Sequence, residues 1–301
     1  MSAPSAPTST TPASAAPQVA APERSGPSAG VRRARLASQL LLWLYAMVAL
    51  FPLLLMVYNS LRPTPEVLAA PLGLPRDLSL DSYLRAWQEA SFGTYFRNSV
   101  VVTVSAVALC TAVSVLAAYP LGRYAFTGSR LLTLYFLSGL MLPFRLSILP
   151  IFYLLASLSL IDSHLGLILV YAASGVPFSV FVLTAFFRQL PAELEEAARI
   201  DGAGEYQIFA RVMLPLVRPA VATVVVFQFV PLWNDFFFPL VLLRSPDKAT
   251  LPVGLTTFFG QFQTDWATLF AGLVIATIPL VVLFIAATRQ IIAGLTAGIG
   301  R

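Results

Sequence analysis

Residues 191–219 read PAELEEAARIDGAGEYQIFARVMLPLVRP, a polar stretch between two long apolar runs. It holds five of the fourteen acidic residues of the chain: Glu193, Glu195, Glu196, Asp201 and Glu205. Carboxylates in a first turn complement the helix dipole, and Pro191 suits a first helical position, where a missing N–H costs nothing. Gly202 tolerates the positive φ that ends a helix. The stretch therefore predicts a helix, a bend at Asp201-Gly202 and a second helix.

The second of these helices is expected to have one apolar face. Between Glu205 and Leu214 the apolar residues recur at helical spacing, and they are Ile208, Phe209, Val212 and Met213. Pro215 and Pro219 then mark the start of the next membrane segment. A bent polar segment of this kind is expected to lie beside the bilayer and to contact a partner in water.

The composition places the chain among polytopic membrane proteins. Of its 301 residues 57% are hydrophobic and 11% charged, and the mean hydropathy is +0.79. The apolar residues come in runs long enough to span a bilayer. The single cysteine, Cys110, lies inside an apolar run, which excludes a disulfide within one chain and a cysteine-based metal site.

Six membrane helices are predicted, in an all-α fold. We place them near Leu36–Leu61, Val100–Tyr119, Leu131–Leu158, Leu165–Phe187, Leu214–Leu243 and Trp266–Thr288. The third and fifth are longer than a bilayer needs and contain Pro143 and Pro150, and Pro231 and Pro239, so tilted or broken helices are expected there. Residues 1–30 are rich in Ser, Ala, Pro and Thr, which predicts a disordered cytoplasmic tail before a membrane domain of residues 31–301.

The distribution of basic residues predicts the orientation. With the N-terminus inside, twelve of the 19 basic residues fall on the cytoplasmic side, six fall outside, and Arg145 lies within the third span. This twofold excess favours cytoplasmic N- and C-termini and puts residues 191–219 in the cytoplasm. The net charge of +5 then needs no nucleic acid to explain it.

The bent segment also resembles a known motif. Glu196-Ala197-Ala198, Gly202 after three further residues, and Val212, Leu214 and Pro215 after nine more resemble the EAA loop of bacterial ABC importer permeases, with Val212 where that family usually has Ile. The resemblance implies a cytoplasmic coupling loop, residues 191–215, that docks in a groove on an ATPase subunit. The residues it assigns to this contact are Glu195, Glu196, Ala197, Ala198, Asp201, Gly202 and Ala203.

Three later stretches resemble the carbohydrate branch of these permeases, in particular the smaller partner of maltose-type importers. They are Trp233-Asn234-Asp235-Phe236 with Pro239, Leu251-Pro252-Val253-Gly254-Leu255, and Gly294-Leu295-Thr296-Ala297-Gly298. By this resemblance the C-terminal tail, residues 289–301, also contacts the ATPase, through Gly294, Leu295, Thr296 and Gly298. The chain ends in GIGR, whereas the family often has a Lys-containing ending.

The resemblance implies a multi-pass permease subunit in a bacterial cell membrane, importing a sugar or oligosaccharide. Its implied partners are a second permease subunit in a heterodimer, two ABC ATPase subunits that bind ATP and magnesium, and an extracytoplasmic sugar-binding protein. This chain itself would bind no cofactor and no nucleic acid. Alternatives are a glycerol-phosphate or polyol permease, a membrane scaffold whose loop binds another protein, and an ion-coupled secondary transporter.

Four polar residues inside the spans are candidates for the substrate path or a gate: Arg145, Gln228, Asn234 and Asp235. An ionisable group at membrane depth costs several kcal/mol unless it faces a polar interior, roughly 2.5–3.5 kcal/mol on insertion scales. Two interpretations of Arg145 and Asp235 stay open, because they can line the path or form ion pairs that only hold helices together.

The chain lacks the usual means of catalysis. Its only lysine, Lys248, precedes Ala249, so no Gly-Lys-Ser/Thr phosphate loop exists. Its only histidine, His164, has no second His or Cys nearby to complete a metal site. No catalytic residue and no metal ligand is therefore predicted.

Overall fold

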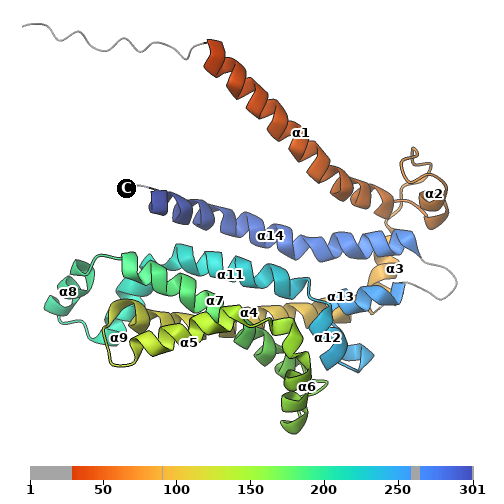
Figure 1. The fold of residues 1–301 in the computed structure, drawn as a ribbon. Helices are drawn as coiled ribbons and strands as arrows, with labels where there is room; N and C mark the ends of the chain where they lie inside the picture. The colour runs from red at the N-terminus through yellow and green to blue at the C-terminus, as the bar shows by residue number, and fades with distance from the viewer. Residues whose placement is uncertain (1–28, 90, 259–264, 300–301) are drawn as a thin grey trace, which may run out of the picture. The chain divides into compact units, whose positions relative to one another are not determined.

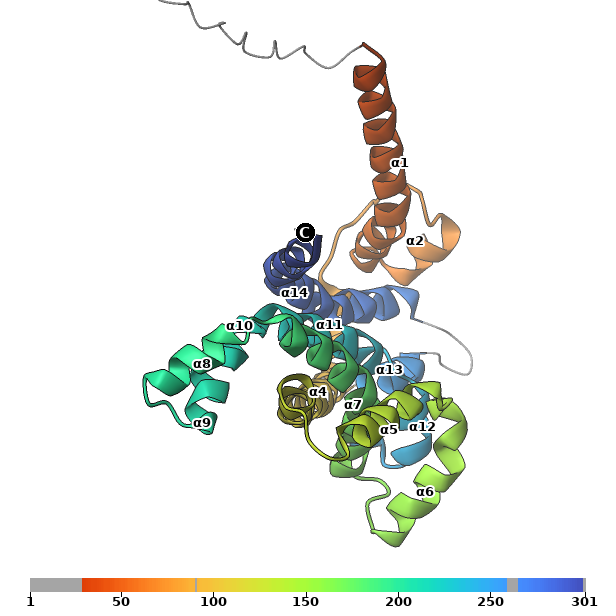
Figure 2. The ribbon, with the colours of Figure 1, turned by 60° about the vertical axis from the view of Figure 1, so that its left-hand side comes forward.

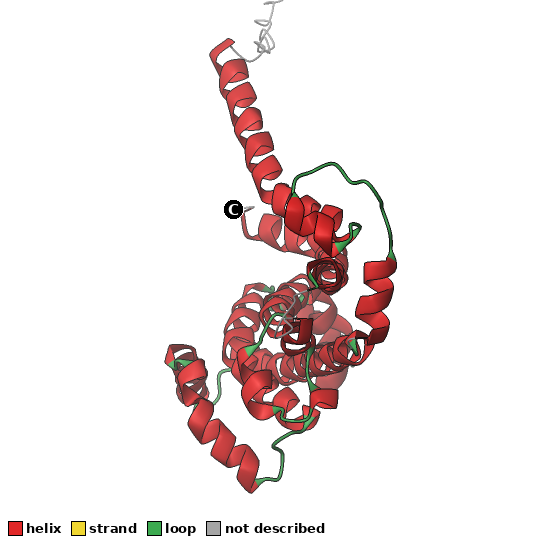
Figure 3. Ribbon diagram, turned by 90° about the vertical axis from the view of Figure 1, so that its right-hand side faces the viewer, coloured by secondary structure: helices red, strands yellow, loops and turns green. Residues whose placement is uncertain are grey.

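The computed structural model describes residues 29–89, 91–258 and 265–299, and these are helical with no strand among them (Figures 1 and 3). Contacts divide the chain into two units, residues 1–52 and 53–301. The first unit is described from Ala29 onward and consists of the first part of α1 (Ala29–Ser60). Of the predicted disordered tail, residues 1–28 lie outside the described residues, whereas Ala29 and Gly30 are the first residues of α1.

Four described helices are long and apolar enough to cross a membrane: α1, α4 (Phe92–Arg123), α7 (His164–Gln189) and α14 (Trp266–Ile299). Two bent pairs raise the number to six if each pair is one span. The first pair is α5 (Ser129–Met141) with residues 144–157, bent by 88°. The second is residues 205–216 with α11 (Arg218–Trp233), bent by 69°. The six predicted spans thus correspond to four continuous and two bent ones.

The break in the third span lies where a proline predicts it. Helix α5 ends at Met141, and Pro143 precedes the short 3₁₀ turn η1 (Phe144–Ser147), which continues into α6 (Ile148–Ser157). Proline lacks the N–H that would continue the ladder of α5. The second predicted breaker, Pro150, lies inside the first turn of α6, where a missing N–H is tolerated.

The predicted extent of the fifth span, residues 214–243, was wrong. The chain bends at Val217, beside Pro219 in the first turn of α11, and not at Pro231, which lies within that helix. Helix α11 ends at Trp233, and α12 (Phe237–Leu242) follows as a separate short helix. A proline in a first turn starts a helix without losing a hydrogen bond, which explains the position of the bend.

The interior of the second unit is built on α4, α7 and α11, which lie side by side (Figure 1). Where α4 and α7 meet, a Cβ on Gly122 would lie 2.7 Å from the Cβ of Phe187. A side chain at this position would separate the two helices. The bent segment of α8 (Glu193–Ile200) and α9 (Glu205–Gln207) projects beyond one end of these helices, and α12 and α13 (Leu251–Gly254) lie at the opposite end (Figures 1 and 2).

Helices α2 (Thr64–Ala69) and α3 (Asp81–Glu89) lie in the loop between α1 and α4. A polar cluster fixes both to the start of α14. Asp265 accepts hydrogen bonds from the hydroxyls of Thr64, at 2.5 Å, and Thr268, at 2.6 Å, and its carboxylate lies 3.5 Å from Nε of Arg85. The short turns η3 (Pro246–Lys248) and η4 (Leu255–Phe258) complete the described helices at this end.

Candidate functional site

Helix α8 (Glu193–Ile200) forms the first half of the bent segment. Its first turn carries three carboxylates and its last turn carries Arg199, so charge complements the helix dipole at both ends. Pro191 lies two residues before the first helical residue, so the prediction of Pro191 as a first helical residue was wrong.

The bend after α8 is a hydrogen-bonded helix stop. Gly202 has φ +81°, a region that disfavours a side chain. Its N–H donates to the carbonyl of Arg199 at 3.0 Å, and the N–H of Ala203 donates to the carbonyl of Ala198 at 2.9 Å. These are the two bonds of a Schellman motif, so the direction of the chain after α8 is fixed by the backbone. The predicted bend at Asp201-Gly202 is therefore present.

The second half of the segment is a helix with a widened turn. It runs through α9 (Glu205–Gln207), the π-helical η2 (Ile208–Met213) and α10 (Leu214–Leu216). The N–H of Leu214 donates to the carbonyl of Phe209, five residues earlier, which is the π-helical bond. The next residue, Pro215, has no N–H with which to continue an α-helical ladder. Such π-helical turns often occur at functional sites.

This second half is seated on the ends of the membrane helices. Ile208 and Met213 are fully buried in a cluster that includes Tyr119 of α4 and Phe187 of α7. The rings of Tyr119 and Phe209 lie 5.0 Å apart between centroids. Full burial of an aliphatic side chain contributes about 1.5–3 kcal/mol. The apolar face predicted for this helix is thus the face that holds it.

A buried ion pair holds the first half. Nε of Arg123, the last residue of α4, donates to Oε1 of Glu195 at 2.9 Å, and the two side chains are 8% and 7% exposed. Arg123 also donates to the carbonyls of Phe187, at 3.1 Å, and Leu190, at 2.7 Å. Carbonyls at a helix end lack partners within the helix. One guanidinium therefore joins the end of α4, the end of α7 and the first turn of α8.

A second polar contact joins the two halves of the segment. Glu205 accepts hydrogen bonds from Nε of Arg199, at 3.0 Å, and from the hydroxyl of Tyr124, at 2.6 Å. The Arg199 guanidinium, followed by the Tyr124 hydroxyl, lowers the pKa of Glu205. Burial, followed by the nearby Glu205, raises the pKa of Tyr124, which stays a donor at neutral pH. The bend is thus closed by side chains as well as by backbone.

The outer face of the segment carries predicted contact residues together with two large side chains. Glu196, Ala197, Asp201 and Gly202 are exposed, and within the described residues neither carboxylate has a hydrogen bond or ion pair. Ile200 and Tyr206 are 87% and 79% exposed. We call Glu196, Ala197, Ile200, Asp201 and Tyr206 the outer face.

The other three predicted contact residues lie elsewhere. Ala198 and Ala203 are half-buried against the hydrophobic cluster that contains Ile208 and Met213, and Glu195 is buried in its ion pair. These three residues hold the segment in place. The two alanines are small enough to pack against the cluster, and the negative charge of Glu195 is opposite to that of Arg123.

The polar residues predicted to line a path lie in a different part of the fold, and Asp235 has several partners. Its Oδ2 accepts from the hydroxyl of Tyr171 at 2.7 Å and from the N–H of Phe238 at 3.1 Å, so it caps α12. Its Oδ1 lies 3.6 Å from a terminal nitrogen of Arg145. Asp235 is 7% exposed and Arg145 is 75% exposed, so only the arginine faces outward.

Gln228 and Asn234 bond within the chain. Nε2 of Gln228 donates to the carbonyl of Gly175, at 3.1 Å, and to the hydroxyl of Ser179, at 3.2 Å, which joins α11 to α7. Nδ2 of Asn234 donates to the carbonyl of Val230 at 2.8 Å, at the end of α11. In the fold as described, Arg145 is the predicted path residue with the most accessible charged group.

The family of the chain follows from comparison with known proteins. The model of the family of binding-protein-dependent transport system inner membrane components matches residues 110–296. The chain belongs to this family. It is therefore a multi-pass membrane protein and a transport component rather than an enzyme.

Among relatives of this permease, the diacetylchitobiose uptake system permease protein NgcG of Streptomyces coelicolor is 38% identical over 89% of each chain. The arabinooligosaccharides transport system permease protein AraQ of Halalkalibacterium halodurans is 38% identical over 88% of this chain and 98% of that one. A solved chain of a bacterial ABC transporter involved in alginate import is similar in fold, with a TM-score of 0.78, 24% identity, and coverage of 89% of this permease and 99% of that chain.

Some predicted contact residues of this permease cannot be placed, and some residues of the site were not predicted. The backbone of Gly294, Leu295, Thr296 and Gly298 belongs to α14, and their side chains lie outside the description. Arg123 and Tyr171 were not predicted, because each lies in or next to an apolar run and gives no pattern of its own. Ile200 had a signal, an apolar side chain just before the polar bend. Among the described residues no three His, Cys, Asp or Glu side chains gather as metal ligands.

Proposed function

We propose that this permease imports a sugar or oligosaccharide by alternating access, coupled to ATP hydrolysis in two partner ATPase subunits. The ATP and its magnesium are bound there, and this chain transmits the movement. The observation that carries the proposal is the geometry of residues 191–215. Their outer face is exposed, while their other side is held at the ends of α4, α7 and α11 by a hydrophobic cluster and the Arg123–Glu195 ion pair. The sugar class is supported by relatives named for diacetylchitobiose and arabinooligosaccharides.

The coupling step follows from the contacts. An ATPase that grips the outer face and moves on ATP binding would pull on α8. The Arg123–Glu195 pair connects α8 to the ends of α4 and α7, and the burial of Ile208 and Met213 connects the second half to the same helices. A displacement of the bent segment is then passed to three membrane helices together, and the path opens on one side or the other.

The proposed assembly has a second permease subunit beside this one and an extracytoplasmic binding protein that delivers the sugar. The name of the family, a binding-protein-dependent transport system, supports the binding protein as a partner. Both termini and the coupling loop lie in the cytoplasm in this proposal, which rests on the excess of basic residues on that side.

The test is purification of the chain from membranes with its transporter partners, followed by ATP-driven sugar uptake in proteoliposomes. The wild type is expected to co-purify with the ATPase and to import sugar. Ile200→Asp is expected to co-purify with at least tenfold less ATPase, because a carboxylate replaces an apolar contact. Gln189→Asp, an exposed change at the end of α7 outside the outer face, is the matched control and is expected to retain it. Retention of the ATPase by Ile200→Asp, or uptake without ATP, would contradict the proposal.

A further inference from the structure

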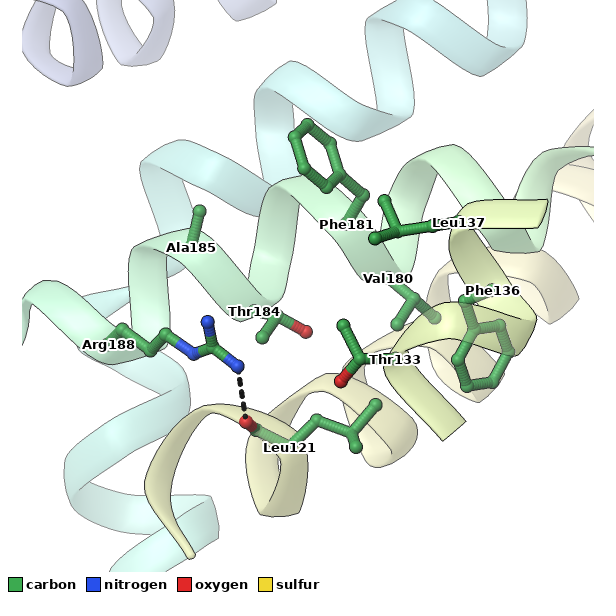
Figure 4. A pocket seen from close by; sticks show the side chains of 9 residues that line it. All are labelled: Leu121, Thr133, Phe136, Leu137, Val180, Phe181, Thr184, Ala185 and Arg188. Atoms are coloured by element: carbon green, nitrogen blue, oxygen red, sulfur yellow. Dashed lines mark hydrogen bonds between the residues drawn. The ribbon is translucent and has the colours of Figure 1, made fainter. Parts of the chain in front are cut away.

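A cavity between α5 and α7 has no part in the proposed coupling. Its volume is about 170 Å³, and its walls are almost entirely carbon, from Phe136, Leu137, Val180 and Phe181 among others. An apolar cavity of about 150 Å³ stays dry and takes up hydrocarbon. Figure 4 shows these side chains around the space, with Arg188 at one end of it. The cavity therefore suits an apolar chain, with a cation at its end.

The cation at this end is only partly engaged. A terminal nitrogen of Arg188 donates to the carbonyl of Leu121 at 3.3 Å, and among the described residues this is the one hydrogen bond of the guanidinium (Figure 4). A guanidinium has five N–H donors, so the others remain available. Arg188 is the last residue but one of α7, where a spanning helix reaches the headgroup level.

A second arginine, Arg130, lies in the first turn of α5, near the cavity. Arg130 lies three residues before Thr133, which lines the cavity, so both are on one face of α5. Arg130 is exposed and has no ion pair or hydrogen bond within the described residues. Neither Arg130 nor Arg188 forms an ion pair with a carboxylate within the described residues, although Glu193 follows Arg188 by only five residues.

One polar side chain in the lining also lacks a partner. Thr184 is 7% exposed, and its hydroxyl is buried without a hydrogen bond within the described residues. Figure 4 shows this hydroxyl directed toward Thr133, one turn from Arg188 and next to the apolar walls. A hydroxyl in this position matches an ester carbonyl, which in a glycerophospholipid lies between the phosphate and the acyl chain.

We propose that this cavity binds an anionic glycerophospholipid, with an acyl chain in the cavity, its ester near Thr184 and its phosphate between Arg130 and Arg188. A phosphate and a guanidinium pair through charge-assisted hydrogen bonds. The lipid would bridge α5 and α7, and so hold the first half of the bent third span. The binding does not depend on the proposed function; only its assignment to the cytoplasmic leaflet rests on the topology proposed above.

The test is native mass spectrometry of the purified transporter complex after titration with phosphatidylglycerol or phosphatidylethanolamine. The double variant Arg130→Gln/Arg188→Gln is expected to bind phosphatidylglycerol roughly 30-fold more weakly, since each basic residue near a membrane surface is worth roughly a factor of five. Arg218→Gln, which removes an exposed arginine at the start of α11 without a cavity contact, is the matched control and is expected to match the wild type.

Further arms test the cavity itself. Ala185→Phe keeps both arginines and fills the cavity, so it is expected to reduce binding of phosphatidylglycerol as well. Equal binding by the wild type and the double variant, equal binding of the two lipids by the wild type, or unchanged binding by Ala185→Phe would each overturn the proposal. So would an efficient short crosslink from Leu137→Cys to the second permease subunit, because a protein helix would then occupy the cavity.

Discussion

Nε of Arg123 lies 2.9 Å from Oε1 of Glu195, and both side chains are more than nine-tenths buried. The contact joins the last residue of α4 to the first turn of α8, 72 residues later. A charged pair in such a place needs hydrogen bonds to its remaining groups, and Arg123 has them in the carbonyls of Phe187 and Leu190. The outer face is therefore presented by a segment that cannot shift without moving α4 and α7.

The first prediction concerns this pair. Glu195→Ala leaves the Arg123 charge buried without its partner, which costs about 3–5 kcal/mol. Residues 191–205 are expected to exchange amide hydrogens faster, and sugar uptake per ATP hydrolysed to fall. Glu193→Ala, on the same helix but exposed, is the control and should leave both quantities unchanged. Normal protection of residues 191–205 in Glu195→Ala would exclude an anchoring role.

The second prediction concerns the bend. Gly202→Pro cannot adopt φ +81° and loses the N–H that bonds to Arg199, so the variant should stay in the membrane but abolish uptake. Gly202→Ala should destabilise the segment by about 1–2 kcal/mol, the cost of a left-handed conformation for a residue with a Cβ.

Gly204 provides the matched control for the bend. It has φ −74°, and a Cβ added there would meet nothing within 4 Å. Gly204→Ala should therefore retain wild-type uptake. Uptake assays and hydrogen exchange of all three variants check these predictions, and full uptake by Gly202→Pro would refute the role given to the bend.

The third prediction separates the two interpretations of Arg145 and Asp235. Asp235→Ala removes the acceptor of Tyr171 and of the α12 N–H, and should lower stability by about 1–3 kcal/mol. Arg145→Gln should cost less than about 1 kcal/mol, because Arg145 is 75% exposed. If Arg145 lines the path, uptake of Arg145→Gln falls although its melting temperature is unchanged. Unchanged uptake would leave the pair a helix contact only.

The fourth prediction is a pH dependence at the opposite end of the fold. The side chain and N–H of Ser245, the N–H of Arg244 and the ammonium of Lys248 hold the pKa of Asp162 well below its usual range. Because its pKa is depressed, the ionised Asp162 carboxylate stabilises the folded loop of residues 244–248. This stabilisation is complete at pH values above the ordinary Asp pKa, about 3.9, and is lost as the pH falls below it.

Residues 244–248 should therefore resist proteolysis equally at pH 7 and pH 5 and lose protection near pH 3. In Asp162→Asn the protection should be lower and should not change between pH 7 and pH 3. Loss of protection between pH 7 and pH 5 in the wild type would contradict this account.

The sequence predicted what periodicity, proline and glycine determine. The helix–bend–helix of residues 191–215, the six spans and the break at Pro143 follow from local chemistry. It did not predict which residues hold the bent segment, because the Arg123–Glu195 and Tyr171–Asp235 contacts join positions more than 60 residues apart. Glu195 and Glu196 are neighbours with the same side chain, and only the packing shows that one is buried and the other exposed.

The most direct test of the central claim uses a single cysteine at Glu196 in a Cys110→Ala background. In the assembled transporter, this cysteine should crosslink to the ATPase subunit and be inaccessible to a membrane-impermeant maleimide added outside intact cells. Labelling of this cysteine from outside, or crosslinking only to extracytoplasmic protein, would contradict the account.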